Sequence, residues 1–259
     1  MEEPTADATA TIQPIVTAGL LVIGDEILSG RTKDKNIGTI AEYLTNLGID
    51  LREVRVVPDV EDEIVAAVNA LRSRYTHVFT TGGIGPTHDD ITADAIAKAF
   101  GVPIGIDQRA VAMLLERIPK MELNEARLRM ARIPAGATLI ANSVSKAPGF
   151  SIGNVHVMAG VPSIMHAMLD ALAPTLTTGR KMHSRSLAAG LKEGDLAGPF
   201  GKVQERFPDV GMGSYPSYQE GVGFTTTLVL RSRDEARLAA AEAEVTAMLE
   251  AVKAGLSGR

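Results

Sequence analysis

The chain has 259 residues, 45% of them hydrophobic and 22% charged, which is the composition of an ordinary globular protein. It contains no cysteine, so disulfides, thiolate catalysis, cysteine-ligated zinc and iron–sulfur clusters are excluded. The net charge of −5 and the aromatic content of 4% argue against a nucleic-acid partner, because nucleic acids favour basic surfaces with exposed aromatic rings. With no apolar run of about 18 residues and no basic leader, we expect a cytoplasmic protein that does not bind membranes.

The N-terminal residues are rich in Thr, Ala and Pro, and we expect residues 1–14 to form a flexible arm. Beyond them, continuous apolar runs alternate with segments whose apolar residues recur at helical spacing. We predict strands at 17–23, 51–57, 76–81, 137–140 and 155–159, and helices at 36–47, 61–72, 92–100 and 161–172, with two more inside 107–131. This alternation predicts an α/β domain over residues 15–175, with helices on both faces of a parallel sheet.

The pattern changes after residues 175–180, which have the composition of a linker. We predict strands at 184–189 and 223–232, and helices at 195–207 and 233–254. These elements would form a small α+β domain over residues 180–259. Four glycines and a proline fall within 211–223, so we expect a loop or an irregular hairpin there.

Three glycines follow the third predicted strand, in the segment Thr80-Thr81-Gly82-Gly83-Ile84-Gly85-Pro86-Thr87-His88-Asp89-Asp90-Ile91-Thr92. Ligands bind at the carboxyl ends of strands in open α/β sheets, and glycines let backbone amides approach an anion closely. We expect Thr92 to cap the next helix, whose N-terminus favours negative charge. The segment therefore predicts a phosphate-binding loop, with a plain glycine-rich turn as the alternative. Its spacing matches neither the dinucleotide fingerprint nor the Walker A loop.

Several carboxylates follow the ends of predicted strands at this same sheet edge: Asp25, Asp34, Asp59, Asp89 and Asp90. So many like charges in one cleft would repel one another unless a cation or a basic ligand were bound. Carboxylates together with phosphate oxygens are a common shell for Mg²⁺. Taken singly, each aspartate has an alternative role in forming a turn or capping a helix.

Two further loops are expected at this edge, 142–150 with two hydroxyls and a lysine, and 159–163 at a strand-to-helix junction. The alternative for 142–150 is an ordinary surface turn. We expect His77 and His156, which fall in strands, to be structural, whereas His88 lies in the glycine segment. We expect five basic residues to form a solvated helix face, with contact to a ligand phosphate as the alternative: Arg117, Lys120, Arg127, Arg129 and Arg132.

The segment 81–92 resembles the signature of the molybdenum-cofactor-biosynthesis, or molybdopterin-binding, family, and most closely that of its competence/damage-inducible CinA group. Other segments follow the pattern of that group in order: 24–28, Asp34 with Asn36, Asn142 with 147–150, and 160–163. The residues around Ser214-Tyr215-Pro216 and 225–231 look like the KH-like domain that follows in CinA proteins. The resemblance covers nearly the whole chain from Ile15. It implies a three-layer α/β/α sandwich with a mostly parallel sheet, followed by a KH-like α+β domain.

By this resemblance, a phosphorylated pterin or nucleotide binds at the carboxyl edge of the sheet. Asp59 and Asp90 match the functional aspartates of the molybdopterin adenylyltransferase branch, and we expect them to be catalytic. A divalent cation (Mg²⁺, Mn²⁺ or Co²⁺) is expected on Asp25, Asp89 and Asp90. The expected ligand-binding residues are Gly24, Asp25, Asn36, Thr81, Gly82, Gly83, Gly85, Pro86, Thr87, Asn142, Ser143, Lys146, Gly149, Gly160, Pro162 and Ser163.

The sequence departs from the family pattern in two ways. Ser145-Lys146 stands where the family has Gly-Thr, which would stiffen the loop and add a charge beside the ligand. CinA proteins commonly carry a further C-terminal deamidase domain, and because the sequence ends at Arg259 we do not expect that activity.

The sequence and the family resemblance are compatible with three functions. The first is metal-dependent hydrolysis of a nucleoside diphosphate derivative such as ADP-ribose or FAD, which the resemblance associates with CinA-type proteins and eukaryotic FAD synthases. The second is non-catalytic binding of molybdopterin, and the third is molybdopterin adenylyltransfer. The KH-like domain favours the first function over the third, because it belongs to the CinA pattern. We also expect a homo-oligomer, either a dimer or a trimer.

Overall fold

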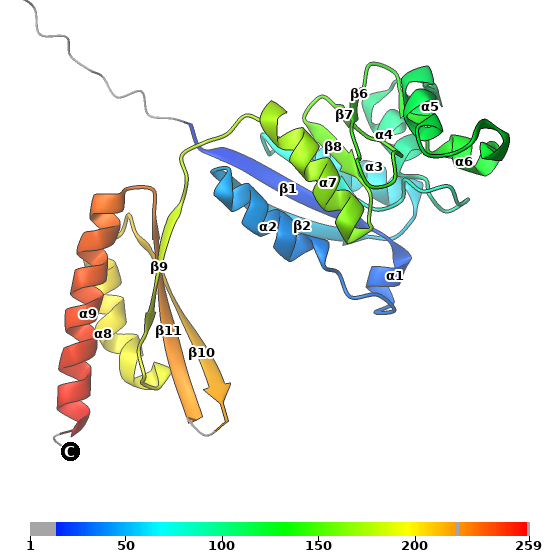
Figure 1. The fold of residues 1–259 in the computed structure, drawn as a ribbon. Helices are drawn as coiled ribbons and strands as arrows, with labels where there is room; N and C mark the ends of the chain where they lie inside the picture. The colour runs from blue at the N-terminus through cyan, green and yellow to red at the C-terminus, as the bar shows by residue number, and fades with distance from the viewer. Residues whose placement is uncertain (1–13, 221–222, 258–259) are drawn as a thin grey trace, which may run out of the picture. The chain divides into compact units, whose positions relative to one another are not determined.

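A computed structural model describes residues 14–220 and 223–257 (Figure 1). The chain divides into two compact units, residues 1–180 and 181–259, each with its own hydrophobic core. Apart from Pro14, the arm expected at residues 1–14 lies outside the described residues. Within the described ranges, no helix combines the length and apolarity needed to cross a membrane.

The first unit is built on a six-stranded sheet of order β2-β1-β3-β8-β7-β6 (Figure 1). Four neighbouring strands are parallel: β2 (Ile49–Val57), β1 (Val16–Ile23), β3 (His77–Thr81) and β8 (Val155–Met158). Next to them, β7 (Gly149–Ile152) runs antiparallel to both β8 and β6 (Thr138–Ile140). The predicted mostly parallel sheet is confirmed.

Helices cover both faces of this sheet and make three layers (Figure 1). On one face lie α2 (Asn36–Asn46) and α7 (Pro162–Leu172), and on the other α3 (Glu61–Arg72), α4 (Thr92–Phe100) and α5 (Gln108–Leu115). In β1, Leu20 packs in the core beneath α2 and α7, whereas Leu21 packs in the opposite core. Because both faces are buried, the strand is apolar throughout and shows no polar alternation.

Three short strands have no clear signal in the sequence: β7, β4 (Ile104–Ile106) and β5 (Arg132–Pro134). Each has three or four residues, too few for a two-residue period to emerge. The two helices predicted within 107–131 are α5 and α6 (Glu125–Arg129), with the 3₁₀ turn η1 (Lys120–Glu122) between them. The remaining elements of the unit are α1 (Asp25–Leu28) and the 3₁₀ turn η2 (Ala173–Thr175).

The second unit is an α+β domain with a three-stranded antiparallel sheet of order β10-β11-β9. Its strands are β9 (His183–Ala188), β10 (Gly211–Gln219) and β11 (Gly223–Ser232), and α8 (Glu193–Arg206) and α9 (Glu235–Ser257) share its core. The expectation of a loop or irregular hairpin at 211–223 is wrong, because β10 pairs regularly with β11 from Gly211 to Gln219. Pro216 is compatible with this strand because β10 lies at an edge of the sheet.

A chain of buried hydrogen bonds crosses β3, β8 and β7. His77 Nε2 lies 3.1 Å from the carbonyl oxygen of Thr177, and His77 Nδ1 lies 3.1 Å from His156 Nε2. His156 Nδ1 lies 2.9 Å from the Ser151 hydroxyl. Burial lowers the pKa of both His77 and His156, so both rings are neutral near pH 7. A neutral ring has one donor and one acceptor nitrogen, so His77 donates to the Thr177 carbonyl and accepts from His156, which in turn accepts from the Ser151 hydroxyl. This arrangement agrees with a structural role.

This chain predicts that acid destabilises the first unit. Burial, together with the smaller effect of the neighbouring His77, lowers the pKa of His156 to about 3. The unfolded chain takes up a proton near the ordinary histidine pKa, whereas the folded chain does not, so stability is complete above about pH 6.5 and falls as the pH drops toward 3. At pH 5 the loss for one such histidine is about 2 kcal/mol.

Denaturant unfolding of wild type between pH 7 and pH 5 measures this loss. His156→Gln keeps polar groups but does not titrate, so its stability should change less over that range. The control is His88→Gln, because the His88 side chain is 98% exposed and should leave the pH dependence as in wild type. Equal pH dependence in wild type and His156→Gln would contradict the assignment.

Candidate functional site

Three strand ends meet at the carboxyl edge of the first sheet, and one of the contacts between them has space only for glycine. A Cβ atom on Gly82, which follows β3, would lie 2.1 Å from the carbonyl oxygen of Ile23 in β1. A Cβ atom on Gly160, which follows β8, would lie 3.3 Å from the Cα of Gly82. Gly82 also has a φ of 103°, in a region that residues with side chains rarely adopt. The backbone itself therefore requires glycine at position 82, whatever binds there.

The loop after β3 is held by the first residue of α4. The Thr92 hydroxyl donates to the Gly82 carbonyl at 3.0 Å, and the Thr92 amide donates to the Gly83 carbonyl at 3.0 Å. The predicted capping role of Thr92 is wrong, because Ile91 occupies the cap position and the hydroxyl is directed back at the strand end. Thr92 thus fixes the loop rather than the helix terminus.

The hydroxyl of Thr92 can be tested against a matched threonine. Thr92→Val removes the donor to Gly82 at a fully buried position and should cost about 1–3 kcal/mol of unfolding free energy. Thr80 is equally buried, and its Oγ1 has no partner among the described residues, so Thr80→Val should be neutral or stabilising. Chemical denaturation of both variants measures the difference; equal effects would show that the Thr92 hydroxyl does not hold the loop.

The glycine loop lines a cleft of about 840 Å³, within the usual range for small-molecule sites. A neighbouring cavity of about 240 Å³ shares part of its lining and reaches the start of α2. Within the described residues, the amides of Gly83, Ile84 and Gly85 donate no hydrogen bond, so three successive N–H groups remain available to an anion. The predicted site residues that line one or both cavities are Asn36, Thr81, Gly82, Gly83, Gly85, Pro86, Asp90, Gly160 and Pro162.

The other predicted site residues do not line these two cavities: Gly24, Asp25, Asp59, Thr87, Asp89, Asn142, Ser143, Lys146, Gly149 and Ser163. Asn142 is buried and organises its own loop, since it donates to the Ala147 carbonyl at 3.1 Å and accepts from the Val144 amide at 2.9 Å. A Cβ atom on Gly149 would lie 2.3 Å from the Val157 carbonyl oxygen, so strand packing requires that glycine.

The charge that Lys146 adds to loop 142–150 is already paired within the protein. Its Nζ lies 2.7 Å from the Glu116 carboxylate at the end of α5. Lys146 is also the one non-glycine residue with positive φ in the described part of the chain, at 66°. A left-handed backbone conformation, which glycine adopts most easily, is here adopted by Lys146. The side chain of this lysine connects the loop to Glu116 at the end of α5.

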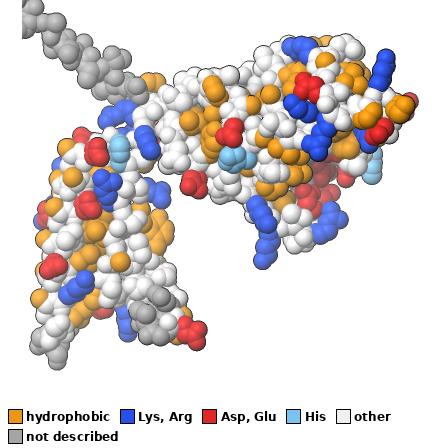
Figure 2. All heavy atoms as spheres, in the orientation of Figure 1, with side chains coloured by type: hydrophobic (Ala, Val, Ile, Leu, Met, Phe, Trp, Pro, Cys, Tyr) orange, Lys and Arg blue, Asp and Glu red, His pale blue; other side chains and the backbone are white. Residues whose placement is uncertain are grey.

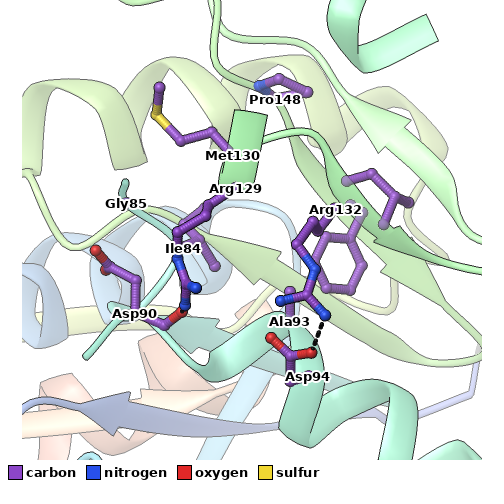
Figure 3. Close-up of a pocket in the computed structure, with 12 residues that line it drawn as sticks. Ile84, Gly85, Asp90, Ala93, Asp94, Arg129, Met130, Arg132 and Pro148 are labelled. Carbon is purple, nitrogen blue, oxygen red and sulfur yellow. Dashed lines mark hydrogen bonds and ion pairs between the residues drawn. The ribbon is translucent and has the colours of Figure 1, made fainter. Parts of the chain in front are cut away.

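Asp90 folds the turn that follows the glycines. Its carboxylate accepts from the Thr87 amide at 2.8 Å and also from the Thr87 hydroxyl. Arg129 lies beside it and donates from Nη2 to the Asp90 carbonyl oxygen at 3.2 Å, while its Nε is buried without a partner (Figure 3). Arg132 pairs with Asp94 at 2.5 Å (Figure 3). These two arginines support the loop and α4, so the expected solvated helix face is wrong for both.

Asp59 connects the end of β2 to the start of α1. Its carboxylate accepts from the Asp25 amide at 3.0 Å. Burial raises the pKa of Asp59, and the nearby carboxylates of Asp25, Glu26 and Asp89 raise it further, against the lowering effect of the Asp25 amide. The sheet edge therefore brings Asp25, Asp59 and Asp89 close enough to interact electrostatically. Asp34 instead accepts from the Ile37 amide at 2.8 Å and holds the start of α2.

The carboxylates do not form a ready-made metal cage. Among the described residues, no group of three or more Asp, Glu or His side chains has metal-binding geometry. Besides burial, the nearby carboxylates raise the pKa of Asp59, and a bound cation would relieve that repulsion. Carboxylate oxygens are ligands that Mg²⁺ accepts together with substrate phosphates and water. The chemistry of these donors is therefore compatible with a cation, although Asp90 is the one aspartate among them that lines the larger cleft.

Some cleft residues are not singled out by sequence reasoning. Glu26 and Thr32 line both cavities, and Lys33 and Lys35 line the smaller one. These residues could have been found from their position just before Asn36, a predicted ligand-binding residue. The Asn36 Nδ2 donates to the Gly160 carbonyl at 2.7 Å. Six residues between α5 and β5 also line the larger cleft: Arg117, Ile118, Pro119, Glu122, Arg127 and Met130. Of these, sequence reasoning names Arg117 and Arg127, for which contact with a ligand phosphate is the alternative to a solvated helix face.

Comparison with known proteins matches each unit to a family. Residues 19–178 match the family described as probable molybdopterin binding domain, and residues 181–254 match the middle domain of FAD synthase. A protein of Caldivirga maquilingensis is 38% identical over 188 residues, covering 70% of this chain and 73% of that protein. A protein of Pyrobaculum calidifontis is 34% identical over 211 residues, covering 77% and 80%.

A solved structure resembles the first unit. It is described as the protein CinA with unknown function from Thermoplasma acidophilum, with 37% identity and a TM-score of 0.58. The match covers 61% of this chain and 96% of that one. The predicted CinA-type resemblance and fold class are confirmed.

Proposed function

Because this chain belongs to the molybdopterin-binding domain family, we propose that its cleft binds a phosphorylated pterin or nucleotide and hydrolyses a nucleoside diphosphate derivative of the ADP-ribose or FAD type. The observation that supports phosphate binding best is that the amides of Gly83, Ile84 and Gly85 donate no hydrogen bond within the described residues. Successive N–H groups in a glycine loop favour anions because they supply partial positive charge without side chains. The match of the second unit to the FAD synthase middle domain supports a dinucleotide-type ligand.

Asp59 is the proposed general base of the hydrolysis. Its raised pKa makes it a better proton acceptor than an ordinary aspartate. In the proposed step a water oxygen attacks one phosphorus atom of the diphosphate, and the bond from that atom to the bridging oxygen breaks. The proton of the water goes to the Asp59 carboxylate, and the bridging oxygen leaves with the other phosphoryl group. ADP-ribose would give AMP and ribose 5-phosphate.

The proposed cation ligands are Asp25, Asp89 and Asp90. When bound, the cation would neutralise charge on the phosphoryl oxygens. Asp90 has a second role, because its carboxylate already holds the Thr87 amide and so shapes the loop.

A second candidate function is the binding of molybdopterin without hydrolysis. It is favoured by the absence of a preformed group of three metal-binding side chains in the described residues. Adenylyltransfer to molybdopterin would use the same carboxylates with MgATP.

The proposed reaction predicts release of AMP from ADP-ribose or FAD by the purified protein with Mg²⁺, Mn²⁺ or Co²⁺. Asp59→Asn can still accept from the Asp25 amide but cannot take a proton, so turnover should fall by roughly 10²-fold or more. Because the charged form of Asp59 is disfavoured by burial, the variant should be at least as stable as wild type.

The matched control is Asp62→Asn, an exposed carboxylate that pairs with Lys98 and should leave turnover unchanged. Product formation is followed by chromatography of AMP. No AMP with any of the three metals, combined with measurable molybdopterin binding, would favour the carrier function. Full turnover by Asp59→Asn would exclude Asp59 as the base.

A further inference from the structure

The larger cleft has a second wall that the proposed reaction does not yet use. Residues 116–131 connect α5 to β5 and form a second arm, which is distinct from the N-terminal arm expected at residues 1–14. The arm residues that line the cleft together with the glycine loop are Arg117, Ile118, Pro119, Glu122, Arg127 and Met130. The glycine loop and the arm therefore form two walls of the same cleft, although they are far apart in the sequence.

Arg117 and Arg127 bring two guanidinium groups to this cleft from different elements. Arg117 follows α5 and donates from Nη1 to the Val144 carbonyl oxygen. Arg127 lies in α6 and donates from Nη1 to the Glu122 carbonyl oxygen and, at 3.1 Å, to the Glu122 carboxylate. A guanidinium carries five N–H donors, so both side chains retain donors for a ligand.

A solvated helix face does not account for this pair. Residues on such a face come from one helix, whereas Arg117, which is exposed, and Arg127, which is half-buried, come from separate segments and line one cavity. Lys120 is exposed in the same arm and lines neither cavity. Basic side chains lie among acidic and apolar ones at the end of the unit that carries α5 and α6 (Figure 2).

We propose that Arg117 and Arg127 form a second anion subsite, which binds the phosphoryl group of a diphosphate ester that the glycine loop does not hold. This inference rests on the proposed function, since it needs the first phosphoryl group at the glycine-loop amides. Planar guanidinium forks bind phosphoryl oxygens in pairs, with shorter and stronger hydrogen bonds than neutral donors make. The subsite makes the cleft selective for diphosphate esters over monophosphate esters.

Glu122 opposes ligand binding at this subsite. Glu122 lines the cleft and its carboxylate pairs with Arg127, so it repels a phosphoryl group and competes for the same donors. Removal of its charge should therefore strengthen binding. An effect of opposite sign to that of the arginine substitutions distinguishes an anion subsite from general damage to the arm.

The test compares AMP with ADP-ribose in titration calorimetry with Mg²⁺, in an Asp59→Asn background that suppresses turnover. Arg117→Gln with Arg127→Gln should weaken ADP-ribose about tenfold to a hundredfold and change AMP less than twofold. Arg127→Lys should give an intermediate loss, because it keeps the charge but not the fork. Glu122→Gln should tighten ADP-ribose several-fold, and Lys120→Gln should change neither ligand.

The outcomes separate this proposal from the function on which it rests. If the background protein binds ADP-ribose and the double arginine variant binds it equally well, the second subsite is wrong and the glycine-loop site stands. If the double variant loses AMP and ADP-ribose alike while its thermal unfolding is unchanged, the arginines do not distinguish the two ligands and the proposal also fails. If the background protein binds neither ligand, both proposals are overturned.

Discussion

The carbonyl oxygen of Ile23 approaches Gly82 so closely that a side chain has no space there, and the shape of the site follows from that contact. It fixes the end of β1 against the end of β3, while Gly160 fixes the end of β8 on the other side. Thr92 then binds the carbonyl of Gly82, and the amides of the next three residues donate no hydrogen bond within the described residues. Packing of backbone against backbone thus creates the row of free donors before any ligand is present.

The electrostatics of this sheet edge combine opposing charges. Amides of the glycine loop and guanidinium groups of the arm favour an anion. The carboxylates of Asp25, Asp59 and Asp89 disfavour one; the pKa of Asp59 is raised mainly by burial, and the nearby carboxylates raise it further. A ligand that carries both phosphoryl groups and a cation satisfies both sets of charges, whereas a bare anion satisfies only the first. This balance is the physical reason to connect the site with metal-bound phosphate esters.

The α/β unit can be predicted from sequence because its parallel strands are buried on both faces and stand out as continuous apolar runs. β10 escapes prediction because its glycines and Pro216 are typical of turns, and only pairing with β11 makes the segment a strand. In the site, the glycine loop is recognisable because close approach restricts residue type. The partner of the Thr92 hydroxyl is not recognisable, since a local pattern does not show which carbonyl a side chain meets. The convergence of Arg117 and Arg127 depends on the path of the arm, which carries no local signal.

If the site works as proposed, the free amides of Gly83, Ile84 and Gly85 hold a phosphoryl group of the ligand. The most direct measurement is a heteronuclear NMR titration of the labelled protein with AMP and Mg²⁺. We expect saturable downfield shifts of these three amide protons, larger than those of any amide in loop 142–150. Unchanged glycine-loop amides, with shifts confined to another part of the unit, would contradict it.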